Sequence, residues 1–190
     1  MAGLGIFGGT FDPPHLGHLI LAQCAYEKLK LDKVIFIPAG IQPHKQDKKI
    51  TSASDRLAML RLAVCNDPKF EISTLEIDSS DVSYSYKTVQ QLRVIYPENE
   101  LYFLIGGDNI SDIDTWMKPE EIFKIAKVAA AKRPDTKTGG RFEKEIMIFD
   151  MPQIGISSTD IREMVKTGQA IKYLVPDSVE NYIMKNKLYI

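Results

Sequence analysis

The feature that most constrains the fold is a short apolar run joined through glycines to a helical pattern. The run Gly3-Leu4-Gly5-Ile6-Phe7 has the length and composition of a buried first strand. Gly8 and Gly9 follow it, and glycine lets the backbone turn tightly through positive φ and approach a ligand without a Cβ in the way. Apolar residues then recur at helical spacing from about His15 to Lys30. This segment therefore predicts a strand, a glycine turn that presents N–H groups, and a helix.

The start of this predicted helix has the properties of an anion site. A helix N-terminus combines free N–H donors with a partial positive charge. His15 and His18 lie three residues apart, so both imidazoles can project from one face of the first turn toward the same point. Gly17 between them leaves space for a bulky ligand. A solvated histidine pair is the plain alternative. A second alternative is a catalytic zinc site, because His15, His18 and His44 are the chain's three histidines.

Two other nucleotide-binding patterns do not fit. Gly3, Gly5 and Gly8 formally match the Gly-x-Gly-x-x-Gly pattern, but the first two fall before or inside the predicted strand instead of after it. The sequence also lacks the Gly-Lys-Ser/Thr of a P-loop. Dehydrogenase-type and P-loop folds are therefore disfavoured.

Composition favours a globular protein that acts on a small molecule. The 190 residues are 44% hydrophobic and 26% charged, which fits one domain spanning residues 1–190. A net charge of −1 gives no electrostatic footprint for nucleic acid. We see no signal peptide or apolar run of membrane-spanning length, and Cys24 and Cys65 lack metal or redox spacing. We therefore expect a cytoplasmic protein that binds no nucleic acid and no membrane.

Strand and helix patterns alternate along the chain. Further strands are predicted at 33–37, 70–73, 101–105, 128–131 and 146–149, and further helices near 54–65, 85–95, 119–125, 158–166 and 176–184. Such alternation predicts an α/β fold with a doubly wound, mainly parallel sheet, and with ligands at the carboxyl ends of the strands. From about residue 157 the predicted elements are helical only.

Other candidate ligand groups follow predicted strands. Lys45 lies in a proline-containing loop after the second strand and could bring a positive charge to a phosphate, although a solvated lysine run is the alternative. Gly106 and Asp108 follow the strand at 101–105, where a carboxylate could bind ribose hydroxyls or simply belong to a turn. Trp116 could stack on a heteroaromatic ligand or be a core aromatic.

A last candidate is the helix start near residue 158. Ser157 or Ser158 can cap that helix, and Arg162, about one turn along, can reach an anion held by the first N–H groups. A capping motif with a surface arginine is the alternative.

Taken together, these segments resemble the nucleotidyltransferase superfamily marked by His-x-Gly-His, and within it the bacterial nicotinate-nucleotide adenylyltransferases. The matching segments run in the family's order through most of the chain: Gly8 to His18, Pro43-His44-Lys45, Ser83 to Val89, Gly106-Gly107-Asp108 with Trp116, Lys132-Arg133-Pro134, and Ile156 to Arg162. The resemblance implies a Rossmann-like nucleotidyltransferase fold. It also implies adenylyl transfer from ATP, with Mg²⁺, to nicotinate mononucleotide, giving deamido-NAD and pyrophosphate in NAD biosynthesis.

The resemblance also assigns roles to residues. It implies that His15, His18, Lys45 and Arg162 act on the phosphates as catalytic residues. The ATP site would further comprise Gly8, Gly9, Thr10, Phe11, Gly106, Asp108, Arg133, Ser157 and Ser158, with Asp108 and Gly106 at the ribose and the backbone around Arg133 at the adenine. The mononucleotide site would comprise Lys45, Ser85, Tyr86 and Trp116, with Trp116 stacked on the pyridine ring and the Ser85 segment at its carboxylate.

Several alternatives stay open at this stage. A related adenylyltransferase would act on nicotinamide mononucleotide or pantetheine phosphate. A three-histidine zinc hydrolase and a nucleotide-sensing module without turnover are the alternatives from other classes. A homo-oligomer is also compatible with the sequence.

Overall fold

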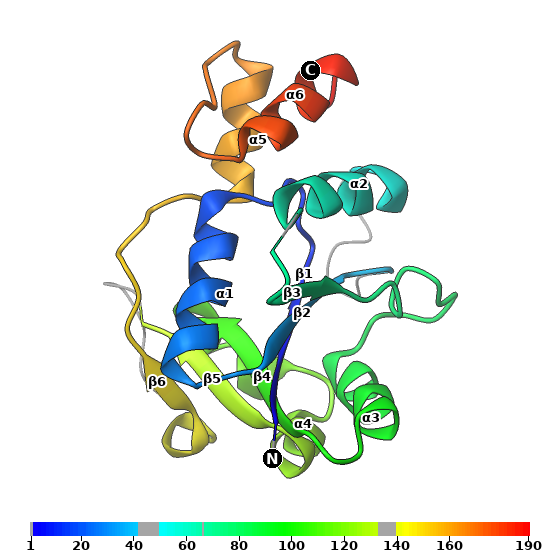
Figure 1. The fold of residues 1–190 in the computed structure, drawn as a ribbon, viewed down its shortest axis with the longest axis vertical. Coiled ribbons are helices and arrows are strands. Elements are labelled where there is room, and N and C mark those ends of the chain that lie inside the picture. The colour runs from blue at the N-terminus through cyan, green and yellow to red at the C-terminus, as the bar shows by residue number, and fades with distance from the viewer. Residues whose placement is uncertain (1, 42–49, 66, 133–139) are drawn as a thin grey trace.

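A computed structural model of the chain describes residues 2–41, 50–65, 67–132 and 140–190. Its centre is a six-stranded sheet with the strand order β3-β2-β1-β4-β5-β6, in which every neighbouring pair is parallel (Figure 1). The strands are β1 (Gly3–Gly9), β2 (Lys33–Pro38), β3 (Phe70–Ile72), β4 (Glu100–Gly106), β5 (Lys127–Ala131) and β6 (Met147–Phe149). This order is typical of doubly wound folds, so the predicted fold class is confirmed.

Helices connect the strands and continue after the last one. They are α1 (Leu16–Lys28), α2 (Ala53–Ala63), α3 (Ser85–Ile95), α4 (Pro119–Ile125), α5 (Ser158–Lys166) and α6 (Asp177–Lys185). The predicted bounds of α3, α4 and α5 are confirmed, and every other predicted helix or strand ends within two residues of the observed one. The described residues also contain three short 3₁₀ helices that were not predicted, because three residues are too few to show a period: η1 (Gly107–Asn109), η2 (Ile113–Thr115) and η3 (Glu143–Glu145).

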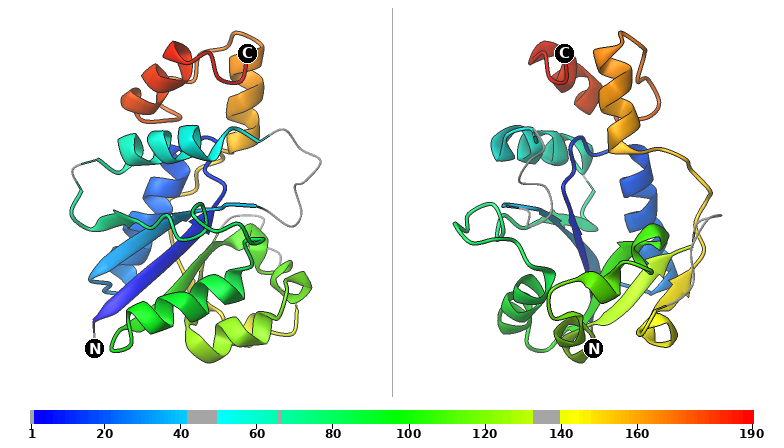
Figure 2. Two further views of the ribbon diagram at one scale, coloured as in Figure 1. Left: turned by 90° about the vertical axis from the view of Figure 1, so that its right-hand side faces the viewer. Right: turned by 180° about the vertical axis from the view of Figure 1, so that it is seen from behind.

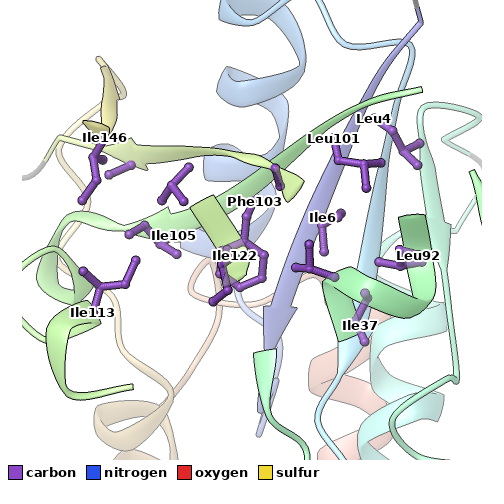
Figure 3. Packing of buried hydrophobic residues seen from close by; sticks show 14 of the residues in the cluster. Leu4, Ile6, Ile37, Leu92, Leu101, Phe103, Ile105, Ile113, Ile122 and Ile146 are labelled. Carbon is purple, nitrogen blue, oxygen red and sulfur yellow. The ribbon is translucent and has the colours of Figure 1, made fainter. Parts of the chain in front are cut away.

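The sheet is buried on both faces. Side chains of successive strand residues point to opposite faces, so Ile6 of β1 faces α3 and α4, where Leu92 and Ile122 pack against it and its neighbours (Figure 3). Phe7 points to the other face and packs in a second cluster with Leu21 of α1. Burial on both faces explains why the strands are nearly continuous apolar runs.

The helices α5 and α6 form a separate layer beyond the carboxyl ends of the strands (Figure 2). Ile161 of α5 and Ile183 of α6 are fully buried in a third cluster, to which α2 contributes Met59. This packing places the start of α5 against the loop between β1 and α1, where Ser158 and Arg162 donate hydrogen bonds to that loop. Among the described helices, none combines the length and the apolar character needed to cross a bilayer.

Candidate active site

A cavity of about 440 Å³ opens at the carboxyl ends of β1 and β4. These neighbouring strands continue into connections that lead to opposite sides of the sheet, which is where doubly wound folds bind ligands. Of the residues predicted from the sequence, Gly8, Gly9, Thr10, His18, Ser85, Gly106, Asp108 and Trp116 line it. The fold thus brings together candidates that are up to 108 residues apart in the chain.

The two glycines at the end of β1 differ from the predicted turn. Both lie within β1, and neither has a φ in the left-handed region; that conformation falls on Phe11, with a φ of 51°. A Cβ on Gly8 would meet no atom within 4 Å, so this glycine keeps the cavity wall open to a ligand. A Cβ on Gly9 would lie 2.9 Å from the ring of Phe11. The glycines therefore permit close approach, as predicted, but they do not make the turn.

Phe11 lies in the core and not in the cavity. Its side chain is 1% exposed and packs edge-on against His18, with ring centroids 5.0 Å apart. Any contact of Phe11 with ATP would therefore come from its backbone, while its ring supports the imidazole of His18.

The two histidines stack on each other at the start of α1. Their ring centroids are 3.7 Å apart and the planes are inclined by 25°. The backbone N–H of His15, the residue before α1, donates to Nδ1 of His18 at 3.2 Å. His15 is 3% exposed, whereas His18 lines the cavity. A Cβ on Gly17 would lie 3.0 Å from Nδ1 of His15, so the space at Gly17 that we expected for a ligand is used by the His15 ring.

The start of α5 lies against the same loop. Ser157 is the N-cap, and its Oγ accepts the N–H of Asp160 at 3.1 Å. The Oγ of Ser158 donates to the carbonyl of Pro13 at 2.9 Å, and Nη1 of Arg162 donates to the carbonyl of Asp12 at 2.7 Å. Ser158 and Arg162 therefore lie beside the histidine helix, although neither lines the cavity.

Two buried charged side chains stabilise the loop between β1 and α1. Asp12 and Arg56 are each 3% exposed. The guanidinium of Arg56 donates to the carbonyls of Thr10 (2.8 Å), Ala39 (2.7 Å) and Thr51 (3.1 Å). Burial lowers the pKa of Arg56, and the negative charge of Asp12 opposes that change. One side chain thus joins the end of β1, the end of β2 and the entry to α2.

The other end of the cavity is aromatic and polar. Trp116 is partly buried, edge-on to Phe103 with ring centroids 6.0 Å apart. Ser85 is the first residue of α3, so backbone N–H groups of that helix start lie at the cavity. Tyr86 does not line the cavity: its ring packs against the core, with Nζ of Lys118 5.2 Å from its centroid. The structure therefore brings Trp116 and Ser85 to the cavity but not Tyr86.

Glu76 lines the cavity between these two ends. Its carboxylate accepts the Thr88 hydroxyl at 2.6 Å and interacts with Ser83 and the backbone of Gly40. Burial raises the pKa of Glu76, and the hydrogen bonds from Thr88 and Ser83 counteract part of that rise. Glu76 thereby connects the strand ends to the segment that precedes α3.

Gly106 and Asp108 shape the end of β4. Asp108 is exposed in η1, at the cavity, and a Cβ on Gly106 would clash with its Oδ1. Glycine at 106 therefore lets this carboxylate lie close to the end of the strand.

Three of the predicted residues lie outside the described residues: Lys45, Arg133 and His44, the third histidine of the zinc alternative. Among the residues that are described, no group of three His, Cys, Asp or Glu side chains could hold a metal ion.

Sequence reasoning missed four residues that line or support this site: Asp12, Arg56, Glu76 and Tyr189, whose hydroxyl donates to Oδ1 of Asp12. Arg56 had a local signal, because it shares one helical face with Met59 and Leu60, at spacings of three and four residues, and both are fully buried. Glu76 and Tyr189 had none, since their neighbours in sequence show no period or motif.

The chain matches known proteins over its whole length. Residues 6–164 match the family model described as cytidylyltransferase-like. A protein of Geobacillus thermodenitrificans named "probable nicotinate-nucleotide adenylyltransferase" is 42% identical over 189 residues, which cover 100% of this chain and 87% of the relative. A Thermoanaerobacter protein of the same name is 44% identical over 198 residues, covering 98% of this chain and 93% of the relative.

Solved structures share the fold. Plasmodium falciparum nicotinic acid mononucleotide adenylyltransferase complexed with NaAD superposes with a TM-score of 0.83 at 21% identity, covering 100% of this chain and 98% of that one. The same protein complexed with APC gives a TM-score of 0.82 at 20% identity. The resemblance inferred from the motifs is thus confirmed: the chain belongs to the cytidylyltransferase-like family and, within it, to the nicotinate-nucleotide adenylyltransferases.

Proposed function

We propose that the protein transfers the adenylyl group of ATP to nicotinate mononucleotide, giving deamido-NAD and pyrophosphate. In this reaction a 5′-phosphate oxygen attacks the α-phosphorus of ATP, and the bond from that phosphorus to the oxygen of the β-phosphate breaks. The full-length relatives support the activity. The observation that carries it is one cavity that is lined both by His18, which can bind a phosphate, and by the aromatic ring of Trp116.

The phosphate end of the cavity supports charge stabilisation as the main contribution of the protein. Phosphoryl chemistry requires little covalent participation of side chains, so positioning and preorganised donors dominate. We assign His18, which lines the cavity, to the triphosphate and to the charge that develops on the α-phosphoryl group. His15, whose buried ring stacks on His18, keeps the phosphate role that its motif predicts. Arg162 and Ser158 approach the same loop from α5 and would hold phosphate oxygens. Lys45 keeps the role that its motif predicts.

Nucleoside and pyridine contacts are assigned to different residues of the cavity. Asp108 and Gly106, at the end of β4, would bind the adenosine ribose, and the backbone around Arg133 would bind the adenine. Trp116 would stack on the pyridine ring, because a flat aromatic face at the cavity suits a flat heterocycle. The N-terminus of α3 at Ser85 would receive the carboxylate of the substrate.

Mg²⁺ fits this site as part of the substrate. The ion usually keeps several waters and binds through substrate phosphates with one or two carboxylates. The described residues contain no cluster of three ligand side chains, which suits an ion that arrives with ATP better than one held in a protein cage. When bound, it would neutralise charge on the triphosphate.

A cytoplasmic setting belongs to the same proposal. Both substrates are intracellular metabolites, and Cys24 and Cys65 are unpaired thiols, as is usual in reducing compartments.

The zinc hydrolase alternative is disfavoured by the geometry of the histidines. The in-plane lone pairs of stacked rings lie in two nearly parallel planes about one ring thickness apart, whereas ligands of one tetrahedral zinc need lone pairs that converge on one point. Metal analysis of the purified protein tests this directly. Zinc at one equivalent per chain would favour the hydrolase.

Pyrophosphate release is the decisive assay for the proposed reaction. Purified protein is incubated with MgATP alone, with added nicotinate mononucleotide, with added nicotinamide mononucleotide, and with added pantetheine phosphate. We expect release with nicotinate mononucleotide and much less in the other mixtures. No release with any acceptor would favour a nucleotide sensor, and faster release with another acceptor would replace the proposed substrate.

A further inference from the structure

The segment that follows α6 returns to the loop between β1 and α1. Tyr189 lies in this segment, and its hydroxyl donates to Oδ1 of Asp12 at 2.7 Å, across 177 residues of sequence. The sulfur of Met59 lies 3.9 Å from the same hydroxyl. Asp12 belongs to the loop that carries the stacked histidines, so this hydrogen bond connects the C-terminal layer directly to the phosphate end of the cavity.

Asp12 is the point where three segments meet. Its Oδ2 accepts the backbone N–H of Thr51, which precedes α2, at 3.2 Å. Its carbonyl accepts Nη1 of Arg162 at 2.7 Å. Because Asp12 is 3% exposed, its carboxylate depends on such donors in place of water. A change at Tyr189 therefore acts on the residue whose backbone orients Arg162.

The phenol of Tyr189 is suited to this task. Burial and the neighbouring Asp12 carboxylate both raise the pKa of Tyr189, so the hydroxyl keeps its proton at neutral pH. A protonated phenol donates to a carboxylate, and hydrogen bonds with a charged acceptor are the stronger ones.

We propose that Tyr189 is a positioning residue for the adenylyl transfer: by donating to Asp12, it fixes the carbonyl that holds Arg162 and so orders the phosphate end of the cavity. The effect of Tyr189 on catalysis rests on the proposed function. Its consequence for ATP binding requires only that ATP binds at this cavity, because Arg162 lies beside the histidine loop whatever the acceptor is.

The chain provides a matched control in Tyr182 of α6. The hydroxyl of Tyr182 donates to Oδ1 of Asp55 at 2.9 Å, so it makes the same type of tyrosine–aspartate bond from the same part of the chain to α2. Asp55 also accepts the hydroxyl of Ser52, the N-cap of α2, so this carboxylate belongs to α2 and not to the loop that holds His15. Tyr182→Phe therefore removes an equivalent bond without reaching Arg162.

The experiment compares Tyr189→Phe and Tyr182→Phe with the unmodified chain. Calorimetric titration with MgATP gives the Kd for ATP without any need for turnover, and melting temperatures show whether the two variants lose similar stability. We expect Tyr189→Phe to weaken ATP binding about tenfold, the size expected for losing a hydrogen bond to a charged group. Tyr182→Phe should change the Kd less than about twofold by the same reasoning. Equal Kd values for the two variants would overturn the proposal.

A double-mutant cycle identifies the route of the effect. If Tyr189 acts through Asp12 on Arg162, then Tyr189→Phe should change the Kd for ATP by less than about twofold once Arg162→Ala is present. A similar loss in both backgrounds would contradict this route. Turnover separates the two claims: a wild type that releases no pyrophosphate overturns the proposed function, whereas an active wild type with an unaffected Tyr189→Phe variant overturns only the positioning role.

Discussion

His18 accepts the backbone N–H of His15 through its Nδ1, at 3.2 Å, while the two imidazole rings lie stacked. A ring nitrogen that accepts an N–H carries no proton, so the proton of the neutral ring lies on Nε2. This tautomer makes Nε2 a donor. The start of α1 therefore selects the form of His18 that can donate to a phosphate oxygen without first becoming charged.

His18→Ala should lower kcat about 10²–10³-fold, the usual cost of removing one well-placed donor to a transition-state charge. Folding should stay intact, because His18 lies at the cavity and leaves the packing of Phe11 on Phe7 and Phe36 in place. Steady-state kinetics by pyrophosphate release, with circular dichroism as the control for folding, check this. A variant that keeps more than about a third of the wild-type kcat would rule out the role assigned to His18.

Trp116→Ala should chiefly raise the KM for nicotinate mononucleotide. The side chain lines the cavity and packs against Phe103, so its loss removes a stacking surface but no phosphate ligand. Trp116→Phe is the matched variant: it keeps a smaller aromatic face and should give a smaller rise. The stacking assignment would be wrong if the KM for ATP rose instead.

Arg56→Met should lower the free energy of unfolding by about 2–5 kcal/mol, because it leaves three partly buried carbonyls without their charged donor. Arg61, an exposed residue in the last turn of the same helix, provides the control. Arg61→Met should change that free energy by less than about 0.5 kcal/mol. Urea denaturation measures both, and equal losses would mean that the Arg56 contacts do not stabilise the loop.

The strands and helices could be predicted because each has its own signal. The run 101–105 is continuously apolar, and β4 is buried on both faces of a parallel sheet. Ser157 precedes an apolar period, and it caps α5 as predicted. The site could be predicted in part for the same reason: Gly8, His18, Asp108 and Trp116 all lie near strand ends, and strand ends converge in this fold.

The rest depends on contacts that no local pattern encodes. Tyr189 reaches Asp12 across 177 residues, and Glu76 is buried by segments on either side of it. The conformation of the first loop is a similar case: the left-handed residue is Phe11 and not a glycine, since its ring occupies the core beside Gly9. Tertiary packing, which a single sequence does not display, decides these features.

Glu76→Gln should make stability less dependent on pH. Burial raises the pKa of Glu76 above its ordinary value of 4.5, so between that value and the raised one the folded chain holds a proton that the unfolded chain has released. The free energy of unfolding contributed by this group therefore falls as the pH rises through that window. The side chain of glutamine cannot ionise, but it keeps an oxygen that can accept the hydrogen bond of the Thr88 hydroxyl.

The difference in unfolding free energy, variant minus wild type, should consequently be larger at pH 8 than at pH 5. Urea denaturation of both proteins at the two pH values measures it, and comparing them at the same pH removes the titration of all other groups. Gln90→Ala, at an exposed position on the helix that carries Thr88, introduces no change in titratable groups and should give the same difference at both pH values. If the Glu76→Gln difference were also the same at both, or larger at pH 5, burial would not control the protonation of Glu76. The expected smaller difference at pH 5 would mean that the folded chain binds a proton at Glu76 more readily than the unfolded chain does, and that the charge of this carboxylate destabilises the fold.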